Sequence, residues 1–340
     1  MLTGGGRDLE AFRANSARLG AVRGLGRADL LIAAVLANDT IAVDTLLNRL
    51  DENQLTQFLS WPRAAAMWLG AFDVAERGAR SQTRPRNPTD VRLAGHRNLA
   101  RILAGTGRWS DVEEQLDLLA ELDPAEGRRQ RAILTTLPWL AIPAAALEAC
   151  RAELEEWRPD TPALGTPLDR VYETHRRAYH LGLVHSRMGE YDTARAWADS
   201  LEALPDVSGV SAVVAGLAAT VRADVAWREG RPASEILSLL DPVRGDVPAL
   251  LWTDPMVGQE HARLLQAIAL HASGREDDAL RLLQNGFENT PGWDYYRAPV
   301  AFLTSLVDEA AGRPEGAAAA RGAFEHLWTD ADAPIALPGR

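Results

Sequence analysis

Several functional classes are excluded by what the sequence lacks. The chain has 340 residues and contains no lysine, so arginine supplies all 36 of its basic side chains. Phosphate-loop ATPases, protein kinases and Schiff-base enzymes depend on a side-chain amine, which this sequence does not provide. The single cysteine, Cys150, excludes an internal disulfide and a multi-cysteine metal site within one chain. We therefore expect no bound cofactor or metal.

Long apolar runs and excess positive charge are also missing. No stretch of about 18 apolar residues could span a bilayer, and the N-terminal residues lack the pattern of a signal peptide. The net charge is −11, whereas binding to nucleic acid phosphates requires a concentrated basic surface. We expect a cytoplasmic protein that binds neither nucleic acid nor membrane.

The alternation of apolar and polar residues that strands require is nearly absent. Amphipathic helical periodicity occurs instead in segments such as ADLLIAAVLAND and HARLLQAIALHASG. These segments end at Gly, or at Asp-Pro and Thr-Pro, as helix capping predicts. The sequence therefore predicts an all-α fold.

Short turns that begin with glycine recur along the chain. The intervals between them are 82, 41, 44 and 38 residues, and the first is about twice the common period. The turns begin at Gly107, Gly189, Gly230, Gly274 and Gly312. This regularity predicts a repeated helical hairpin of about 40 residues.

Small residues stand at fixed offsets from these glycines, which favours close packing of two antiparallel helices. Seven residues before each turn lie Ala100, Gly182, Ala223, Ala267 and Ser305. Five residues after it lie Val112, Ala194, Glu235, Ala279 and Ala317. Glu235 does not fit, so we expect a shifted or shortened second helix there.

The segment AYHLGLVHSRMGEYDTARAWADSLEALP resembles a tetratricopeptide repeat. It carries the family's signature residues Leu181, Gly182, Gly189, Tyr191, Ala194 and Pro205. The spacing here is nearer 40 residues than the 34 typical of the family, and His185 replaces the usual aromatic residue. The resemblance implies an α-solenoid, a stack of antiparallel helix hairpins with a concave surface that binds a protein or peptide.

The C-terminal segment is similar to the repeat region that follows the kinase or cyclase domain in some bacterial signalling proteins. Trp328 and the acidic TDADAP sequence after it carry this similarity. We divide the chain into irregular N-terminal hairpins at 1–87, tetratricopeptide-like repeats at 88–332 and a flexible tail at 333–340.

Three of the seven histidines, His175, His180 and His185, lie within eleven residues. Steps of five residues point to three different sides of a helix, so one helix cannot bring them to a single metal ion. We interpret them as structural.

The concave surface of a stacked array is lined by the first helix of each hairpin. Positions 13, 10, 6 and 3 residues before each turn glycine share one face of that helix. The candidate partner-binding residues chosen from this face are Arg97, Arg101, Arg176, Tyr179, Asp224, Trp227, His261 and His271. Arg, Tyr and Trp are enriched in binding hot spots, and the arginines favour an acidic partner segment. The sequence thus predicts a non-catalytic protein-binding scaffold.

Two alternatives remain open. A ligand-sensing signal-transduction module that partners a kinase, a cyclase or a transcription factor would have a closed pocket, for instance around Trp227 and Trp252. A hydrolase on an α/α scaffold would bring ionisable groups from several hairpins together, for instance His261, His271 and Asp224.

Overall fold

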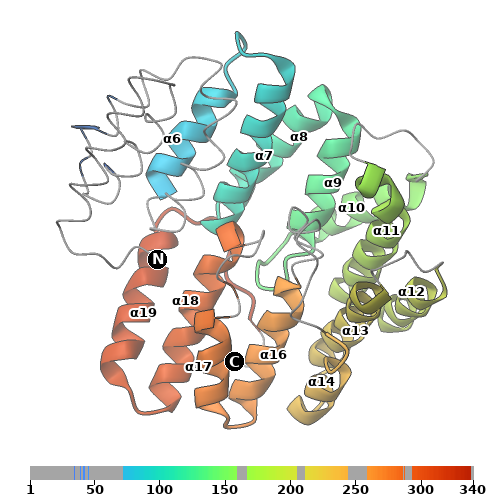
Figure 1. The fold of residues 1–340 in the computed structure, drawn as a ribbon, viewed down its shortest axis with the longest axis vertical. Helices are drawn as coiled ribbons and strands as arrows, with labels where there is room; N and C mark the ends of the chain where they lie inside the picture. The colour runs from blue at the N-terminus through green and yellow to red at the C-terminus, as the bar shows by residue number, and fades with distance from the viewer. Residues whose placement is uncertain are drawn as a thin grey trace. The chain divides into compact units, whose positions relative to one another are not determined.

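The described part of the chain is helical throughout (Figure 1). The computed structural model describes residues 72–158, 167–204, 211–243, 259–285, 287 and 293–337, together with positions 34, 39, 41, 42 and 45. Within these ranges the helices are α6 (Phe72–Gln82), α7 (Thr89–Gly105), α8 (Trp109–Leu122), α9 (Pro124–Thr135), α10 (Ala144–Glu156), α11 (Pro167–Arg187), α12 (Tyr191–Ala203), α13 (Ser211–Arg228), α14 (Ala233–Leu239), α16 (Glu260–Ala272), α17 (Glu276–Asn285), α18 (Trp293–Ala310) and α19 (Pro314–Leu327). The predicted all-α solenoid is confirmed.

Contacts divide the chain into two compact units. Unit 1 comprises residues 1–103 and 111–122, and unit 2 comprises residues 104–110 and 123–340. The sequence placed a boundary at residue 87, next to a loop rich in proline and arginine. That loop is instead anchored, because the buried side chain of Asn87 donates to the carbonyls of Ser81 at 2.9 Å and Gln82 at 2.8 Å.

All five turn glycines adopt the left-handed conformation, with φ between 69° and 79°. Four turns form the same pair of backbone hydrogen bonds. At Gly189, the glycine amide donates to Ser186 at 3.1 Å and the next amide donates to His185 at 2.9 Å. The turns at Gly230, Gly274 and Gly312 repeat both bonds. This is the Schellman helix ending, which favours glycine because a side chain is strained at positive φ.

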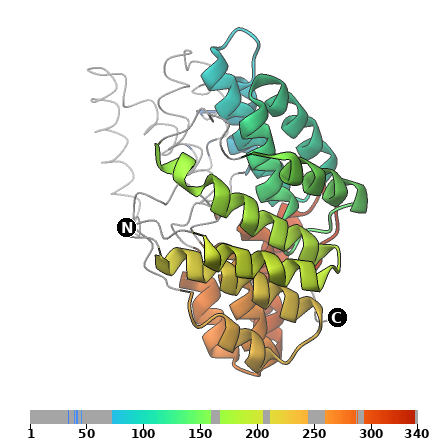
Figure 2. The same ribbon diagram turned by 90° about the vertical axis from the view of Figure 1, so that its right-hand side faces the viewer.

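The described residues of unit 2 form five hairpins: α9 with α10, α11 with α12, α13 with α14, α16 with α17, and α18 with α19. The first helix of each hairpin also contacts the first helix of the next. Figure 2 shows the green and yellow hairpins stacked in this order. The helix after Gly230 is shortened, as predicted: α14 has seven residues, and Ile236 is buried while Glu235 pairs with Arg231.

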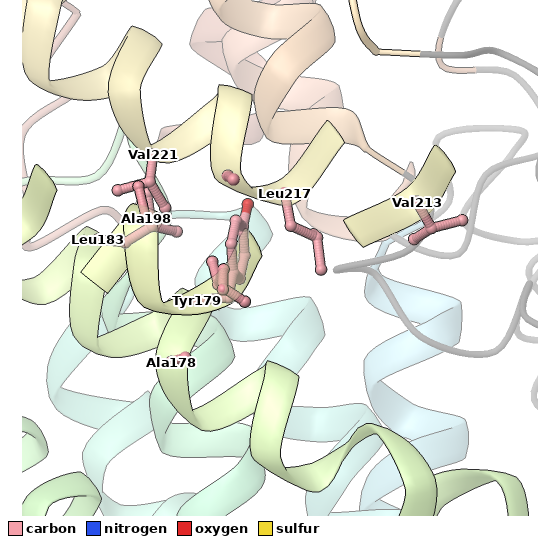
Figure 3. Packing of buried hydrophobic residues seen from close by; sticks show 9 residues of the cluster. Ala178, Tyr179, Leu183, Ala198, Val213, Leu217 and Val221 are labelled. Atoms are coloured by element: carbon pink, nitrogen blue, oxygen red, sulfur yellow. The ribbon is translucent and has the colours of Figure 1, made fainter. Parts of the chain in front are cut away.

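Gly182 lies where α11 meets α13. An added Cβ would lie 2.9 Å from Cγ1 of Val221, a buried β-branched side chain with little freedom to move. The surrounding core joins three helices, and Figure 3 shows Tyr179 and Leu183 of α11 facing Leu217 and Val221 of α13. The absence of a side chain at Gly182 therefore permits close packing, and the closest contact is with α13 of the next hairpin, whereas the sequence predicted it with the second helix of the same hairpin.

The C-terminal residues fold back onto the beginning of unit 2. The carboxylate of Asp332 accepts hydrogen bonds from the amides of Trp109 at 2.6 Å and Ser110 at 3.0 Å, the first two residues of α8. Ile335 forms an antiparallel bridge with Leu140. An added Cβ at Gly107 would lie 2.5 Å from the Trp328 ring. Within the predicted tail at 333–340, backbone groups of residues 333, 334 and 336 form hydrogen bonds with residues 107, 141 and 139.

Aromatic rings continue this contact into the interior of unit 2. The buried Trp139 ring meets Trp328 edge-on at 5.8 Å and Tyr296 edge-on at 6.4 Å. The guanidinium of Arg187, at the end of α11, donates to the carbonyls of Leu137 and Leu140 on either side of Trp139. Burial lowers the pKa of Arg187 to about 9, which leaves it charged at neutral pH. The segment after α9 is therefore fixed from two sides.

We predict that Gly182→Ala lowers the free energy of unfolding by up to about 2 kcal/mol. The added methyl group causes overpacking that costs about 1–3 kcal/mol, while the gain in helix propensity offsets about 1 kcal/mol. Gly322→Ala in α19 is the matched control, because an added Cβ there contacts nothing within 4 Å. It should raise stability by up to about 1 kcal/mol. Denaturant unfolding checks both, and equal effects would contradict the packing role of Gly182.

We predict that Asp332→Ala lowers stability by about 0.5–2 kcal/mol, the range for losing a helix cap. Burial raises the pKa of Asp332, but the hydrogen bonds from Ser110 and Trp109 outweigh it, so the net shift is downward. Because folding lowers this pKa, the stability that the Asp332 carboxylate contributes is present above about pH 4, the usual pKa of the group. It is lost as the pH falls further.

The difference in stability between wild type and Asp332→Ala should therefore shrink below about pH 4. The exposed neighbour Asp330 provides the control, and Asp330→Ala should change little at any pH. Thermal unfolding measured from pH 3 to 7 would test this. A loss for Asp332→Ala that does not depend on pH would rule out the charged cap.

Candidate functional site

Most of the residues predicted to line an exposed groove are buried. Arg176, Tyr179, Asp224, Trp227 and His261 all have less than a tenth of their surface exposed. The expectation of an open stripe is wrong for these five, because the first helices pack against one another along the face that carries them. His271 is half-buried on α16, and Arg97 and Arg101 are half-buried on α7 of unit 1.

Arg176 lies in a buried ion-pair network. Its guanidinium donates to the carboxylate of Glu173, which also accepts from Arg129 at 2.9 Å. The side chains of Arg176 and Glu173 are 2% and 5% exposed. Glu173 therefore links α11 to Arg129 of α9 while it pairs with Arg176 on its own helix, and an acidic partner segment would have to displace that carboxylate from Arg176.

Asp224 is the centre of a second buried network that joins three hairpins. Its Oδ2 accepts from the hydroxyl of Ser186 at 2.6 Å and from Nε of Arg228 at 2.8 Å. Its Oδ1 lies 3.0 Å from Nε2 of His261. The Asp224 side chain is fully buried. Every carboxylate oxygen thus has a partner, as a buried charge requires.

The charges in this network determine its protonation. Burial raises the pKa of Asp224, but Arg228 and His261 stabilise the anion more strongly, so its pKa lies well below the ordinary value. Burial lowers the pKa of His261, and its bond to Asp224 only partly opposes this. Because the Asp224 carboxylate only accepts, Nε2 of His261 carries the hydrogen of the bond between them.

The arrangement of Ser186, Asp224 and His261 differs from a hydrolytic triad. Such a triad places the histidine between the nucleophile and the carboxylate, so that it can take the nucleophile's proton. Here Ser186 donates directly to Asp224. His271, the third residue proposed for a hydrolase, lies 2.7 Å from the carboxylate of Glu276 instead. The structure brings together His261 and Asp224, and His271 is bound elsewhere.

A small pocket, with a cavity volume of about 30 Å³ and partly open to solvent, lies beside this network. It is lined by Ile133, Thr136, Leu137, Tyr179, His180, Leu183, His261, Tyr295 and Tyr296. These residues come from α9 and the segment after it and from α11, α16 and α18, so first helices of four hairpins supply the wall. Tyr179 and His261 were predicted to line the partner-binding surface, whereas the other seven were not.

Three of the pocket residues, His180, Tyr295 and Tyr296, were not predicted to line it. His180 was interpreted as structural, and it is buried with its Nδ1 3.0 Å from the hydroxyl of Thr136 on another hairpin. Tyr295 and Tyr296 lie in WDYYRAP, where adjacent tyrosines before a helical Pro299 were the available signal. Of the other histidines, His175 is buried, and Nδ1 of His185 lies 2.5 Å from Glu190.

The structure does not describe a pocket around both Trp227 and Trp252, the pair proposed for a sensor. Trp227 is buried under the guanidinium of Arg228, 5.3 Å from the ring centre, and is not part of the pocket wall. Trp252 lies outside the described residues. In the described ranges, no cluster of three His, Cys, Asp or Glu could hold a metal ion. No described helix combines the length and apolar character needed to cross a bilayer.

Neither a protein-family model nor a curated protein sequence matches the chain. Among solved structures, the chain is similar to a tetratricopeptide repeat protein from Parabacteroides merdae ATCC 43184. The sequence identity is 16% and the TM-score is 0.39, with 81% of this chain and 93% of that chain covered. At this level of similarity, the fold assignment rests on the helices and glycine turns described above.

We predict that Asp224→Ala lowers stability by about 3–5 kcal/mol, because it leaves the partly buried guanidinium of Arg228 without its carboxylate. Asp192→Ala is the control. It removes a carboxylate from a similar Asp–Arg pair on the surface of α12, where the loss should be at most about 1 kcal/mol. The double variant Asp224→Ala/Arg228→Met should recover part of the loss. Chemical unfolding measures all three, and equal losses for the two single variants would contradict this account.

Proposed function

We propose that the chain is a non-catalytic binding module that holds a segment of a partner protein against the first helices of its hairpins. One observation carries the proposal: first helices from four hairpins of unit 2 converge on a single pocket lined by aromatic and imidazole side chains. Pockets with mostly apolar walls and a few polar groups are the usual form of binding sites. Tyrosine is also a frequent anchor in protein interfaces.

The charged groups near the pocket have structural partners, which supports binding without chemistry. Asp224 is neutralised by Arg228, and Ser186 is engaged with Asp224. A nucleophile or a general base would need a hydrogen-bond arrangement directed at a substrate. The proposed role therefore depends on shape and hydrogen bonding.

Arg97 and Arg101 of unit 1 provide a second element of the proposal. They lie one turn apart on α7 and are both half-buried, so their side chains share one face of the helix. Guanidinium groups bind carboxylates well. We propose that this pair favours an acidic partner segment, and we propose no nucleic acid or membrane partner.

A random peptide library displayed on phage and selected on the full chain would test the proposal. We expect enriched peptides whose affinity falls at least fivefold in Leu183→Phe, which fills the pocket. Leu237→Phe on α14, outside the pocket wall, is the matched control and should bind normally. Circular dichroism and thermal unfolding would show that both variants are folded.

The same peptides test the arginine pair. For acidic peptides, Arg97→Ala/Arg101→Ala should weaken binding, and the loss should shrink at high salt. Arg275→Ala/Arg281→Ala is the control, because these exposed arginines share Asp278 on α17. An absence of enriched peptides, or affinities unchanged in Leu183→Phe, would refute the binding module.

A second function is favoured by the small size and partial enclosure of the pocket. A signal-transduction module that partners a kinase, a cyclase or a transcription factor would use this pocket for a free small molecule. It would bind that molecule while selecting no peptide.

A further inference from the structure

We infer that the surface covered by residues 332–336 is a second binding site of unit 2, which takes an extended acidic segment of a partner protein. Residues 332–336, here called the strap, occupy this site until the partner displaces them. The site is separate from the pocket, because none of the residues that bond to the strap lines the pocket wall. The inference goes beyond the proposed function and does not depend on the pocket.

The second half of the strap pairs with the edge of the segment after α9. The amide of Ala141 donates to the carbonyl of Pro334 at 3.1 Å, and the amide of Ala336 donates to the carbonyl of Trp139 at 2.7 Å. This antiparallel pairing is the mode in which a peptide adds a strand to an exposed edge. The bonds use only backbone groups, so an extended segment of another sequence can form them too. The residue equivalent to Ala336 must not be proline, which lacks the donor.

The first half of the strap supplies selectivity for an acidic residue. The carboxylate of Asp332 accepts from the amides of Trp109 and Ser110, where helix α8 begins. The positive end of a helix favours a negative charge. The amides of Asp332 and Ala333 also donate to the carbonyl of Gly107, at 3.1 and 3.0 Å, which fixes the position of the carboxylate. The site therefore selects an aspartate followed by an extended stretch.

The strap buries little of its own surface, so a partner can displace it. Asp332, Pro334 and Ala336 are exposed, Ile335 is half-buried and Ala333 is buried. Larger side chains of a partner segment at the exposed positions can add contacts that the strap does not make. A second copy of this chain offers the same strap and gains no contact by exchange, while association costs entropy. The occupant that this surface favours is therefore a segment of a different protein.

The site keeps its edge when the strap leaves. Arg187 of α11 donates to the carbonyls of Leu137 and Leu140, which holds the edge without using the strap. The Trp328 ring, which precedes the strap in the chain, meets Trp139 edge-on at 5.8 Å. Because these contacts remain, displacement of the strap exposes a preformed edge, and binding requires little ordering of the site.

The test titrates a fluorescent peptide TDADAPIALP, the sequence of residues 329–338, into the full chain and measures anisotropy. Asp332→Ala/Ala336→Pro releases the strap, and this variant should bind the peptide with a Kd between roughly 10 μM and 1 mM. Wild type should bind at least about tenfold more weakly, because the tethered strap competes at a high effective concentration. Leu183→Phe added to the released variant should change nothing, so this site and the pocket can fail separately.

Further variants test the individual bonds. Ser110→Pro added to the released variant should weaken binding at least about threefold, because proline fits the first turn of a helix but lacks the amide that binds the carboxylate. In the peptide, Asp332→Asn should weaken binding to a similar degree and Ala336→Pro should abolish it. Pro334→Ala is the matched control and should bind normally, because residue 334 contributes its carbonyl.

Hydrogen exchange on wild type keeps the test decisive if the released variant does not fold. With excess peptide, the amides of Ala333 and Ala336 should exchange faster, while that of Ala141 stays protected because the peptide replaces the strap. Unchanged exchange, equal acceleration at all three amides, or binding that is insensitive to Asp332→Asn in the peptide would overturn the inference. Dimerisation of wild type that Asp332→Ala/Ala336→Pro abolishes would also overturn it, because the occupant would then be a second copy.

Discussion

The left-handed glycine turn is the constraint on which the rest of unit 2 depends. A residue with φ near +70° ends one helix, and the two backbone hydrogen bonds at the turn fix where the next helix begins. The register of each hairpin follows from this geometry, so Gly182 and Ala194 occupy corresponding places on their helices. Repetition of the turn brings the first helices to one side of the stack. Tyr179, Asp224 and His261 stand 10, 6 and 13 residues before their glycines, spacings that lie on one face of a helix.

Close packing of these first helices creates a requirement of its own. Side chains on the shared face lose contact with water, and any charge there needs a partner. Asp224 meets this requirement through Ser186 of α11, Arg228 of α13 and His261 of α16. Because its partners come from three hairpins, the network is satisfied in only one relative placement of the three. A buried polar network of this kind favours a single register over alternatives of similar hydrophobic content.

A feature was predictable from the sequence when the residues that form it lie close together along the chain. The turns and the short α14 depend on residues within about one hairpin, and the sequence pattern predicted both. The close approach at Gly182 involves Val221 of the next hairpin. The burial of the candidate groove residues depends on neighbouring hairpins, so one-helix spacing misjudged their exposure. Asp332 bonds to residues more than 220 positions away, and His180 to a hydroxyl 44 positions away. No local pattern carries such pairings.

The pocket wall and the C-terminal residues share a structural element, which bears on how the pocket binds. Trp139 contacts Trp328 of the C-terminal segment on one side and Tyr296 of the pocket on the other. Arg187 fixes the carbonyls that flank Trp139, and one of them belongs to Leu137 of the pocket wall. A wall held in this way is already in place before an occupant arrives. Binding then requires little ordering of side chains in the wall.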